Sequence, residues 1–263
     1  MPDSSTEKQF KRPIRSFVKR EGKFTTGQQN AIDDLWPTHG VDLNDQQLDL
    51  DALFGRNAPV VLEIGFGNGL SLADMAETHS EMNFFGIEVH KPGVGSCLVQ
   101  AKKRELNNIR VTGDDAVLVL NQQIPDGSLE RVQIFFPDPW HKKRHHKRRL
   151  IQPEFVQTLL EKLKIGGQIH VATDWENYAE HVLAVLTSNK NLHNTVAGAP
   201  LAKQFLSADN QVITDSEQWP AGVTLAQGSA EKPEYRPHTK YEARGIRLGH
   251  GVWDLVFTKQ AAR

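Results

Sequence analysis

From residue 58 onward the chain alternates between short, nearly continuous apolar runs and longer segments whose apolar positions recur every three or four residues. Continuous runs are typical of strands covered on both faces, and the longer spacing is typical of helices with one buried face. The predicted strands cover residues 58–65, 83–90, 109–112, 131–138 and 168–174. The predicted helices cover residues 68–79, 91–108, 114–123, 175–188, and a segment that begins at Pro153 and ends at Gly166 and Gly167. This order predicts an α/β fold, a mostly parallel twisted sheet with helices on both faces and right-handed crossovers.

The N-terminal part departs from this alternation. Residues 1–50 lack sustained periodicity and open with a basic stretch. We expect an extension that is mobile at first and is then docked by Leu35 and Trp36. Residues 51–263 are expected to form the main domain.

The C-terminal part also changes character. Residues 191–237 are rich in Gly, Pro, Ser and Asn. They indicate either a strand followed by a long excursion or a surface insertion with many loops. Residues 251–259 predict a closing strand, with Gly245 to Gly251 as the turn before it.

Composition narrows the class of protein. The 263-residue chain is 38% hydrophobic and 24% charged, which is typical of a globular protein and excludes a disordered one. Its single cysteine, Cys97, excludes an intrachain disulfide and is expected to pack in the core. No apolar run approaches the roughly 18 residues of a membrane span, and the first residues lack the hydrophobic core of a signal peptide. We therefore expect a cytoplasmic protein.

The distribution of charge is more informative than its total of −1. Residues 1–23 carry a local charge of +4 and residues 138–149 a local charge of +5, which leaves −10 for the remaining residues. Two basic patches on an acidic body favour a polyanionic partner, whereas a solvated charge run is the alternative explanation. The sequence contains no repeated apolar seam of the kind that indicates an obligate assembly, so we expect a monomer.

Acidic side chains follow nearly every predicted strand. In an open parallel sheet, ligands bind at the carboxyl ends of the strands, near the point where the strand order reverses. The residues at these ends are Glu63 with Gly65, Gly67 and Gly69, then Glu88, Asp115, Asp138 and Asp174. Helix capping is the alternative explanation, which suits Asp115 and Asp174 but poorly explains Glu63, inside a strand.

The glycine turn EIGFGNG has the form G-x-G-x-G. It differs from the dinucleotide-binding pattern G-x-G-x-x-G, because Leu70 stands where the last glycine of that pattern would fall. Glu88, at the end of the second strand, suits a ribose whose two hydroxyls donate to one carboxylate. Together with Glu63 and Asp115, the turn favours a cofactor that contains adenosine.

Four motifs, EIGFGNG, GIEVH, GDDAV and FFPDPWHKKRHHKRR, resemble the bacterial tRNA (guanine-N7)-methyltransferases, a family of class I S-adenosylmethionine enzymes. RSFVKREGKFTTGQQNAIDDLWP, ATDWE and HTKYEARGIRLGHGVWDLVF are similar to the same family. The resemblance covers nearly the whole chain except the first ten or so residues and the 191–237 segment, which is longer than the family usually carries. It implies a Rossmann-like fold, S-adenosyl-L-methionine as cofactor, and guanine 46 in the variable loop of tRNA as substrate.

The resemblance also implies roles for individual residues. Cofactor contacts are expected from Glu63, Glu88, Asp115 and Asp138, and from the glycine turn at Gly65, Gly67 and Gly69. Substrate contacts are expected from Lys142, Asp174, Thr239, Lys240, Tyr241 and Glu242. RNA contacts are expected from Arg144, His145, His146, Lys147, Arg148 and Arg149. Asp138 is placed at the reaction centre as the catalytic residue.

The chemistry of guanine methylation is compatible with these residue types. Guanine N7 carries an in-plane lone pair, so no general base is needed, and alignment with electrostatic assistance suffices. A carboxylate such as Asp138 stabilises the developing cation and accepts from guanine N1–H and N2–H. Pro137 and Pro139 stiffen its turn by fixing φ. Trp140 either stacks on the base or fills the core.

Other interpretations of the basic run are weaker. His141 and His145 have the spacing of metal ligands on a helix, but the six surrounding cations would repel a metal ion, so no metal is expected. A nuclear localisation patch is a further alternative, yet a position directly after Asp138 favours phosphate contacts beside an active site.

Three other functions remain open at this stage. An S-adenosylmethionine-dependent methyltransferase that acts on another RNA or on a small molecule is one alternative, and the basic run argues against a small molecule. A non-catalytic RNA-binding scaffold is another, although the intact acidic positions disfavour it. A nicotinamide dehydrogenase ranks last because of the glycine spacing.

Overall fold

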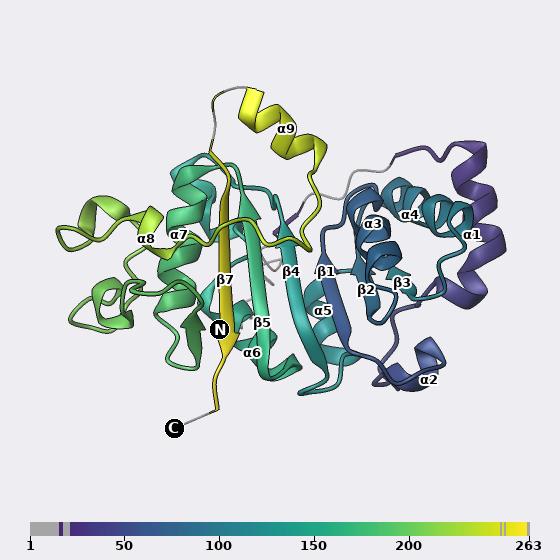
Figure 1. Cartoon of the computed structure of the whole chain (residues 1–263), viewed down its shortest axis with the longest axis horizontal. Coiled ribbons are helices and arrows are strands. Elements are labelled where there is room, and N and C mark those ends of the chain that lie inside the picture. The colour runs from purple at the N-terminus through teal and green to yellow at the C-terminus, as the bar shows by residue number, and fades with distance from the viewer. Residues whose placement is uncertain (1–15, 18–21, 248, 250, 262–263) are drawn as a thin grey trace, which may run out of the picture.

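The computed structural model describes residues 16–17, 22–247, 249 and 251–261. Within them the chain forms a sheet of seven strands in the order β3-β2-β1-β4-β5-β7-β6 (Figure 1). The strands are β1 (Val60–Ile64), β2 (Asn83–Ile87), β3 (Ile109–Thr112), β4 (Leu129–Phe135), β5 (Leu163–Thr173), β6 (Leu192–Asn194) and β7 (Trp253–Lys259). Strands β1 to β5 pair in parallel, and β7 pairs antiparallel with β5 and β6. The predicted Rossmann-like class, with a mostly parallel sheet, is confirmed.

Helices cover the two faces of the sheet through separate cores. The helices are α1 (Thr26–His39), α2 (Leu50–Phe54), α3 (Leu70–Thr78), α4 (Lys91–Lys103), α5 (Ala116–Gln122), α6 (Pro153–Lys162), α7 (Glu176–Thr187), α8 (Leu225–Gly228) and α9 (Lys240–Arg247). One core joins β1, β2, β4, β5, β6 and β7 with α2, α5, α6, α7 and α8. The other joins the strands of the β1–β3 half with α1, α3 and α4. Over β4, β5 and β7, this second face is instead crossed by the chain leading from α8 to α9 (Figure 1).

Helix α1 is the main element that periodicity did not predict. Its sequence is rich in polar residues, so it lacks a continuous apolar stripe. A capping box starts it, in which the Thr25 hydroxyl accepts from Gln28 N–H and the Gln28 side chain accepts from Thr25 N–H. Leu35 and Trp36 pack against the core of the β1–β3 half, so the predicted docking by these two side chains is confirmed. Residues 1–15 and 18–21, in the part of the extension expected to be mobile, lie outside the described residues.

Three predicted boundaries were wrong. Helix α6 ends at Lys162 and not at the glycines, because β5 already pairs with β4 at Leu163. The pairing then slips, and Gly166 adopts a φ of +84° inside this irregular start of β5. Gly245 belongs to α9 and not to a turn, so the turn before β7 is shorter than predicted. Helix α4 likewise stops at Lys103, short of the expected residue 108.

Residues 191–237 follow the first of the two predicted alternatives, a strand followed by a long excursion. Strand β6 pairs with the edge of β7, and the excursion that follows contains two 3-10 turns and the short α8. Its buried Phe205, Trp219 and Leu225 pack into the core that contains α7. In the part of the chain that is described, no helix is long and apolar enough to cross a membrane.

Candidate functional site

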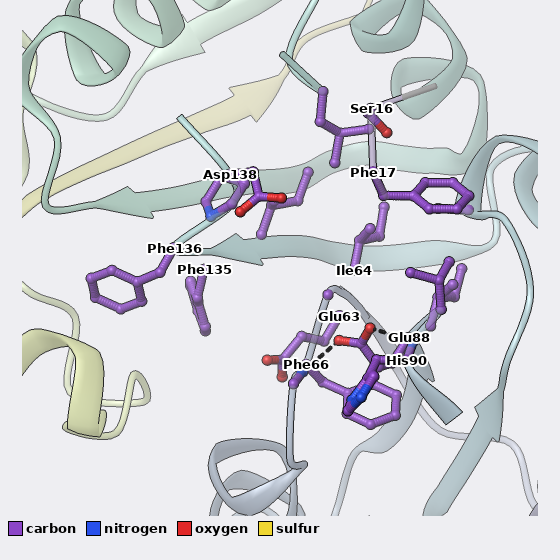
Figure 2. Close-up of a pocket in the computed structure, with 18 of the residues that line it drawn as sticks. Ser16, Phe17, Glu63, Ile64, Phe66, Glu88, His90, Phe135, Phe136 and Asp138 are labelled. Atoms are coloured by element: carbon purple, nitrogen blue, oxygen red, sulfur yellow. Dashed lines mark hydrogen bonds between the residues drawn. The ribbon is translucent and has the colours of Figure 1, made fainter. Parts of the chain in front are cut away.

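A cavity of about 770 Å³ opens at the carboxyl ends of the parallel strands. It lies where the strand order reverses, between the turn after β1 and the turn after β4. In the view of Figure 2, Glu63, Phe66 and Glu88 lie along one side and Ser16 and Asp138 along the other. Of the predicted site residues, it is lined by Glu63, Gly65, Gly67, Glu88, Asp115, Asp138, Lys142, His145 and Thr239. The topology therefore brings together nine of the nineteen predicted site residues, including every predicted cofactor contact except Gly69.

The glycine turn forms the floor of the cavity next to β1. Gly65 and Gly67 have φ values of +80° and +62°, which side chains rarely adopt, and a Cβ at either would meet only open space. Their backbone is thus exposed to a ligand. Position 69 requires a glycine for a different reason. Gly69 does not line the cavity, and a Cβ there would lie 2.3 Å from the Cβ of Cys97. The structure places Gly69 at the contact between α3 and α4.

Glu63 is the most perturbed acid of the site. Its carboxyl group is buried on β1 and accepts a 3.0 Å hydrogen bond from Gln133 Nε2. Burial raises the pKa of Glu63 to about 7, against the smaller lowering effect of Gln133, and the nearby Glu88 raises it further. A raised pKa on a carboxyl group in a cavity is typical of a functional position.

Glu88 lies beside it at the end of β2. Its two carboxylate oxygens accept 2.8 Å hydrogen bonds from the backbone N–H groups of Gly67 and His90 (Figure 2). Burial raises the pKa of Glu88, and these two hydrogen bonds oppose that effect. The side chain thereby ties the glycine turn to the end of β2 and remains on the cavity wall.

Removing the charge of Glu63 is expected to stabilise the folded protein above neutral pH. The pKa of Glu63 rises from its ordinary 4.5 to about 7 on folding. The buried carboxyl therefore leaves the free energy of unfolding unchanged below pH 4.5 and lowers it increasingly as the pH rises to 7. The full loss is about 3 kcal/mol. In urea unfolding, the free energy of unfolding of Glu63→Gln relative to the parent should increase by about 2 kcal/mol from pH 5 to pH 8. Glu217→Gln, at an exposed carboxylate, is the control, and an equal gain at both pH values would contradict the buried charge.

Asp115 and Asp174 differ in the way they are used. Asp115 caps α5, since its carboxylate accepts from Val117 N–H at 3.0 Å, and it also lines the cavity. The capping alternative and the cavity position therefore both hold. Asp174 does not cap α7, whose N-cap residue is Trp175 and which has no side-chain cap hydrogen bond. It lies outside the cavity lining and close to Gly245 of α9.

The turn after β4 carries Asp138 into the cavity. Phe136 and Trp140, on either side of it, have positive φ values of +52° and +47°. Such strain in non-glycine residues is held only by surrounding structure and is common at functional sites. Asp138 itself is exposed and lines the cavity. Its carboxylate is therefore accessible to a ligand.

Trp140 does not fill the core, which was one of its two predicted roles. The ring is half-buried, its Nε1–H donates to Ser16 O at 3.1 Å, and the Arg148 guanidinium lies 4.0 Å from the ring centre. It lines the cavity and is not a core residue. This contact holds Ser16 and Phe17 beside the turn, although 124 residues separate Ser16 from Trp140.

The basic run forms a 3-10 helix, Lys143–Arg148, at the rim of the cavity. Lys143, Arg144 and Lys147 are exposed. Partial burial and then the neighbouring cations lower the pKa values of His145 and His146, so both rings are neutral at pH 7. The exposed cations provide a positively charged surface directly beside Asp138.

Arg149 does not belong to this surface. Its side chain is buried, and it donates to Pro139 O at 3.0 Å and to Asn177 Oδ1 at 2.7 Å. Burial lowers its pKa to about 10. The guanidinium of Arg149 therefore braces the turn that carries Asp138 against α7 and does not lie on the exposed surface of the basic run.

Substitutions at two neighbouring cations should separate these roles. Arg149→Met is expected to lower the free energy of unfolding by about 2–4 kcal/mol, because buried acceptors lose a charged donor. Lys147→Met, at an exposed position, should leave unfolding unchanged and weaken RNA binding. Urea unfolding and RNA titration of both variants check this. If Arg149→Met kept its stability and lost RNA affinity, the buried assignment would be wrong.

The segment before β7 contributes one predicted residue to the cavity and hides another. Thr239 lines the cavity and starts α9: its hydroxyl accepts from Glu242 N–H at 3.1 Å. Glu242 is buried and paired with Arg236, so a direct substrate contact from its carboxylate does not agree with the structure. Lys240 and Tyr241 belong to α9, and their side chains lie outside the described part of the structure.

Other lining residues were not singled out from the sequence. They are chiefly Ser16, Phe17, Phe66, His90, Phe136 and His238. Phe66 and His90 stand inside the motifs EIGFGNG and GIEVH, so those motifs already contained the signal. For Ser16 and Phe17 the only signal was the resemblance over the N-terminal segment. Among the described residues, no cluster of three or more His, Cys, Asp or Glu side chains is arranged to hold a metal ion.

Comparisons with known proteins extend this description. Residues 57–219 match a family model described as "Putative methyltransferase". The tRNA (guanine-N(7)-)-methyltransferase of Aeromonas hydrophila is 52% identical over 95% of this chain and 94% of its own length. The tRNA (guanine-N(7)-)-methyltransferase of Psychromonas ingrahamii is 51% identical over 98% of this chain and 94% of its own. Among solved structures, the 16S rRNA methyltransferase KamB matches with a TM-score of 0.47 and 15% identity, over 82% of this chain and 95% of that chain.

Proposed function

The chain belongs to the tRNA (guanine-N(7)-)-methyltransferase family, and on that premise we propose that it transfers a methyl group from S-adenosyl-L-methionine to N7 of guanine 46 in tRNA. One observation carries the proposal. A single cavity combines a glycine turn, the buried Glu63 and the half-buried Glu88 on one side with an exposed carboxylate and a cationic rim on the other. This is the arrangement that a cationic cofactor and a polyanionic substrate require when they meet.

The cofactor half suits S-adenosylmethionine. The open backbone at Gly65 and Gly67 leaves room for close approach, and Glu88 stands at the end of β2 for a ribose. Glu63 and Asp115 would complete the contacts, with Glu63 ionising when a cationic group arrives beside it. When bound, the cofactor supplies a methyl group on a sulfonium, a good leaving group.

The base half depends on Asp138. Its carboxylate accepts N–H donors of guanine at the Watson–Crick edge, which adenine does not present in the same pattern. As the purine becomes cationic, the same charge stabilises it electrostatically. Because N7 carries a free lone pair, no proton has to be removed before methyl transfer. Lys142 and Thr239, which line the same cavity, would position the nucleotide.

The basic run would form the RNA-binding surface beside these two halves of the cavity. Lys143, Arg144 and Lys147 would bind phosphates and position the tRNA without reading its sequence. A base in a folded RNA must leave its stack to enter a cavity, and cations at the rim hold the displaced backbone. The proposed contacts from His145, His146 and Arg148 extend this surface.

A labelling experiment tests the whole proposal. The protein is incubated with methyl-labelled S-adenosylmethionine and tRNA that lacks modifications, and the RNA is then cleaved chemically at N7-methylguanine. The expected result is labelled tRNA with one cut, at position 46. Label without that cut would overturn the guanine-N7 assignment, and label from a tRNA with adenine at position 46 would overturn the site.

A further inference from the structure

Buried polar side chains lie on the face of the sheet that the chain between α8 and α9 crosses (Figure 1). They are His170 on β5, Asp254 on β7 and Arg236 in the crossing segment, each with a side chain no more than 3% exposed. Buried ion pairs are a weak source of stability, since desolvation offsets most of their attraction. Stability alone therefore does not explain this cluster, and the contacts of Arg236 indicate another role.

Arg236 holds two carboxylates at once. Its Nη1 and Nη2 donate to the two oxygens of Glu242 at 3.0 and 2.9 Å. Nη2 also donates to Asp254 Oδ2 at 2.9 Å, and Nε lies 2.6 Å from Asp254 Oδ1. The planar guanidinium thereby ties the start of α9 to β7. A lysine ammonium has no such fork and cannot reproduce the geometry.

Through Glu242, Arg236 reaches the wall of the cavity. Glu242 N–H donates to the Thr239 hydroxyl at 3.1 Å, and Thr239 N–H donates back to Glu242 Oε2 at 3.4 Å. Thr239 lines the cavity, whereas Arg236 and Glu242 do not. The Arg236 guanidinium also lies 5.8 Å from the ring centre of Phe136, in the turn that carries Asp138. One side chain therefore stands behind two parts of the cavity wall.

Asp254 is also held by a hydrogen bond with His170. Burial lowers the pKa of His170, against the hydrogen bond and charge of Asp254, so the ring is neutral at pH 7. His170 Nε2 lies 2.7 Å from Asp254 Oδ1, and the Tyr235 hydroxyl lies 2.9 Å from His170 Nδ1. With a neutral ring, Nε2–H donates to Asp254 and Nδ1 accepts from Tyr235. Asp254 is thereby oriented toward Arg236.

We propose that Arg236 is a positioning residue for methyl transfer, which holds Thr239 at the cavity wall by binding Glu242 and Asp254 together. This inference rests on the proposed function. It assigns the buried polar cluster to the placement of the nucleotide rather than to the binding of cofactor, because its contacts lead to Thr239. Tyr235 and His170 act one step further away, through Asp254.

The test compares Arg236→Lys with Leu255→Ala. Leu255 follows Asp254 on β7, and its side chain packs in the hydrophobic core on the other face of the sheet. Both variants are expected to lower Tm. Arg236→Lys should also lower kcat/KM for tRNA by about 10- to 100-fold, while the cofactor Kd stays within threefold of the parent. Leu255→Ala should keep kcat/KM within threefold.

Equal kcat/KM values for the two variants would overturn the proposal, as would a parallel loss of cofactor affinity in Arg236→Lys. Should Arg236→Lys fail to fold, Tyr235→Phe removes a single O–H from the same cluster. It should lower kcat/KM for tRNA two- to fivefold at unchanged cofactor Kd, and an unchanged kcat/KM would then overturn the proposal. Failure of the proposed function is separate: the parent protein itself would produce no N7-methylguanine.

Discussion

An Asp138→Asn enzyme is expected to bind cofactor and tRNA and to methylate tRNA about 10²–10³-fold more slowly. Asparagine keeps the size of the side chain but loses the charge that would face the developing purine cation. It also replaces one acceptor oxygen by an NH₂ group, which would oppose the N–H donors of guanine. Single-turnover methylation rates at saturating tRNA and cofactor measure the chemical step directly. Asp209→Asn, at an exposed position of the 191–237 segment, is the matched control.

The same variant separates stabilisation of charge from recognition of the base. tRNA carrying inosine at position 46 lacks the N2 amino group but keeps N7 and N1–H. If Asp138 accepts from N2–H, inosine should slow the parent enzyme and have a smaller effect on Asp138→Asn, since the contact is already lost. If its charge alone matters, the two effects multiply. Full turnover by Asp138→Asn with guanine would contradict both roles.

The arrangement of the site was predictable because it follows from topology. Parallel strands place their carboxyl ends at one edge of the sheet, so Glu63, Glu88 and Asp115 meet once their strands are recognised. The apolar runs that mark those strands are unambiguous, since both faces of each strand are covered. Asp138 follows from the same rule applied to β4.

Of the helices that the sequence did not predict, α1, α2, α8 and α9, the first and the last show the physical reason. Helix α1 buries few side chains, chiefly Ala31 and His39, so its apolar periodicity is weak, although the capping box at Thr25 marked its start. Helix α9 contains a glycine and begins where Glu242 meets Arg236. That ion pair depends on a tertiary contact with β7, which local sequence does not reveal.

The difference between Arg148 and Arg149 also lay beyond sequence reasoning. Two adjacent arginines in a basic run are equivalent on the basis of composition. In the 3-10 geometry, Arg148 turns toward the ring of Trp140 while Arg149 turns inward to Pro139 O and Asn177. Only the packing of the turn against α7 decides which guanidinium is buried.

Neutralising the exposed cations of the basic run is the second substitution with a large expected effect. The triple variant Lys143→Gln, Arg144→Gln, Lys147→Gln should weaken tRNA binding by about 10²-fold at 0.1 M salt. Each phosphate contact contributes roughly 0.7 to 0.9 to the slope of log K against log salt, so losing three should reduce that slope by about 2 to 3. Binding titrations at several salt concentrations measure both quantities together.

The salt slope makes this prediction specific to phosphate contacts. A substitution that merely distorted the site would lower affinity by the same factor at every salt concentration, because it would release no fewer counterions. The three side chains are exposed, so the cofactor Kd and Tm should stay close to those of the parent. Lys164→Gln, an exposed cation at the start of β5 and far along the sheet from the cavity, should change neither slope nor affinity. An unchanged slope in the triple variant would assign the RNA-binding surface to another part of the molecule.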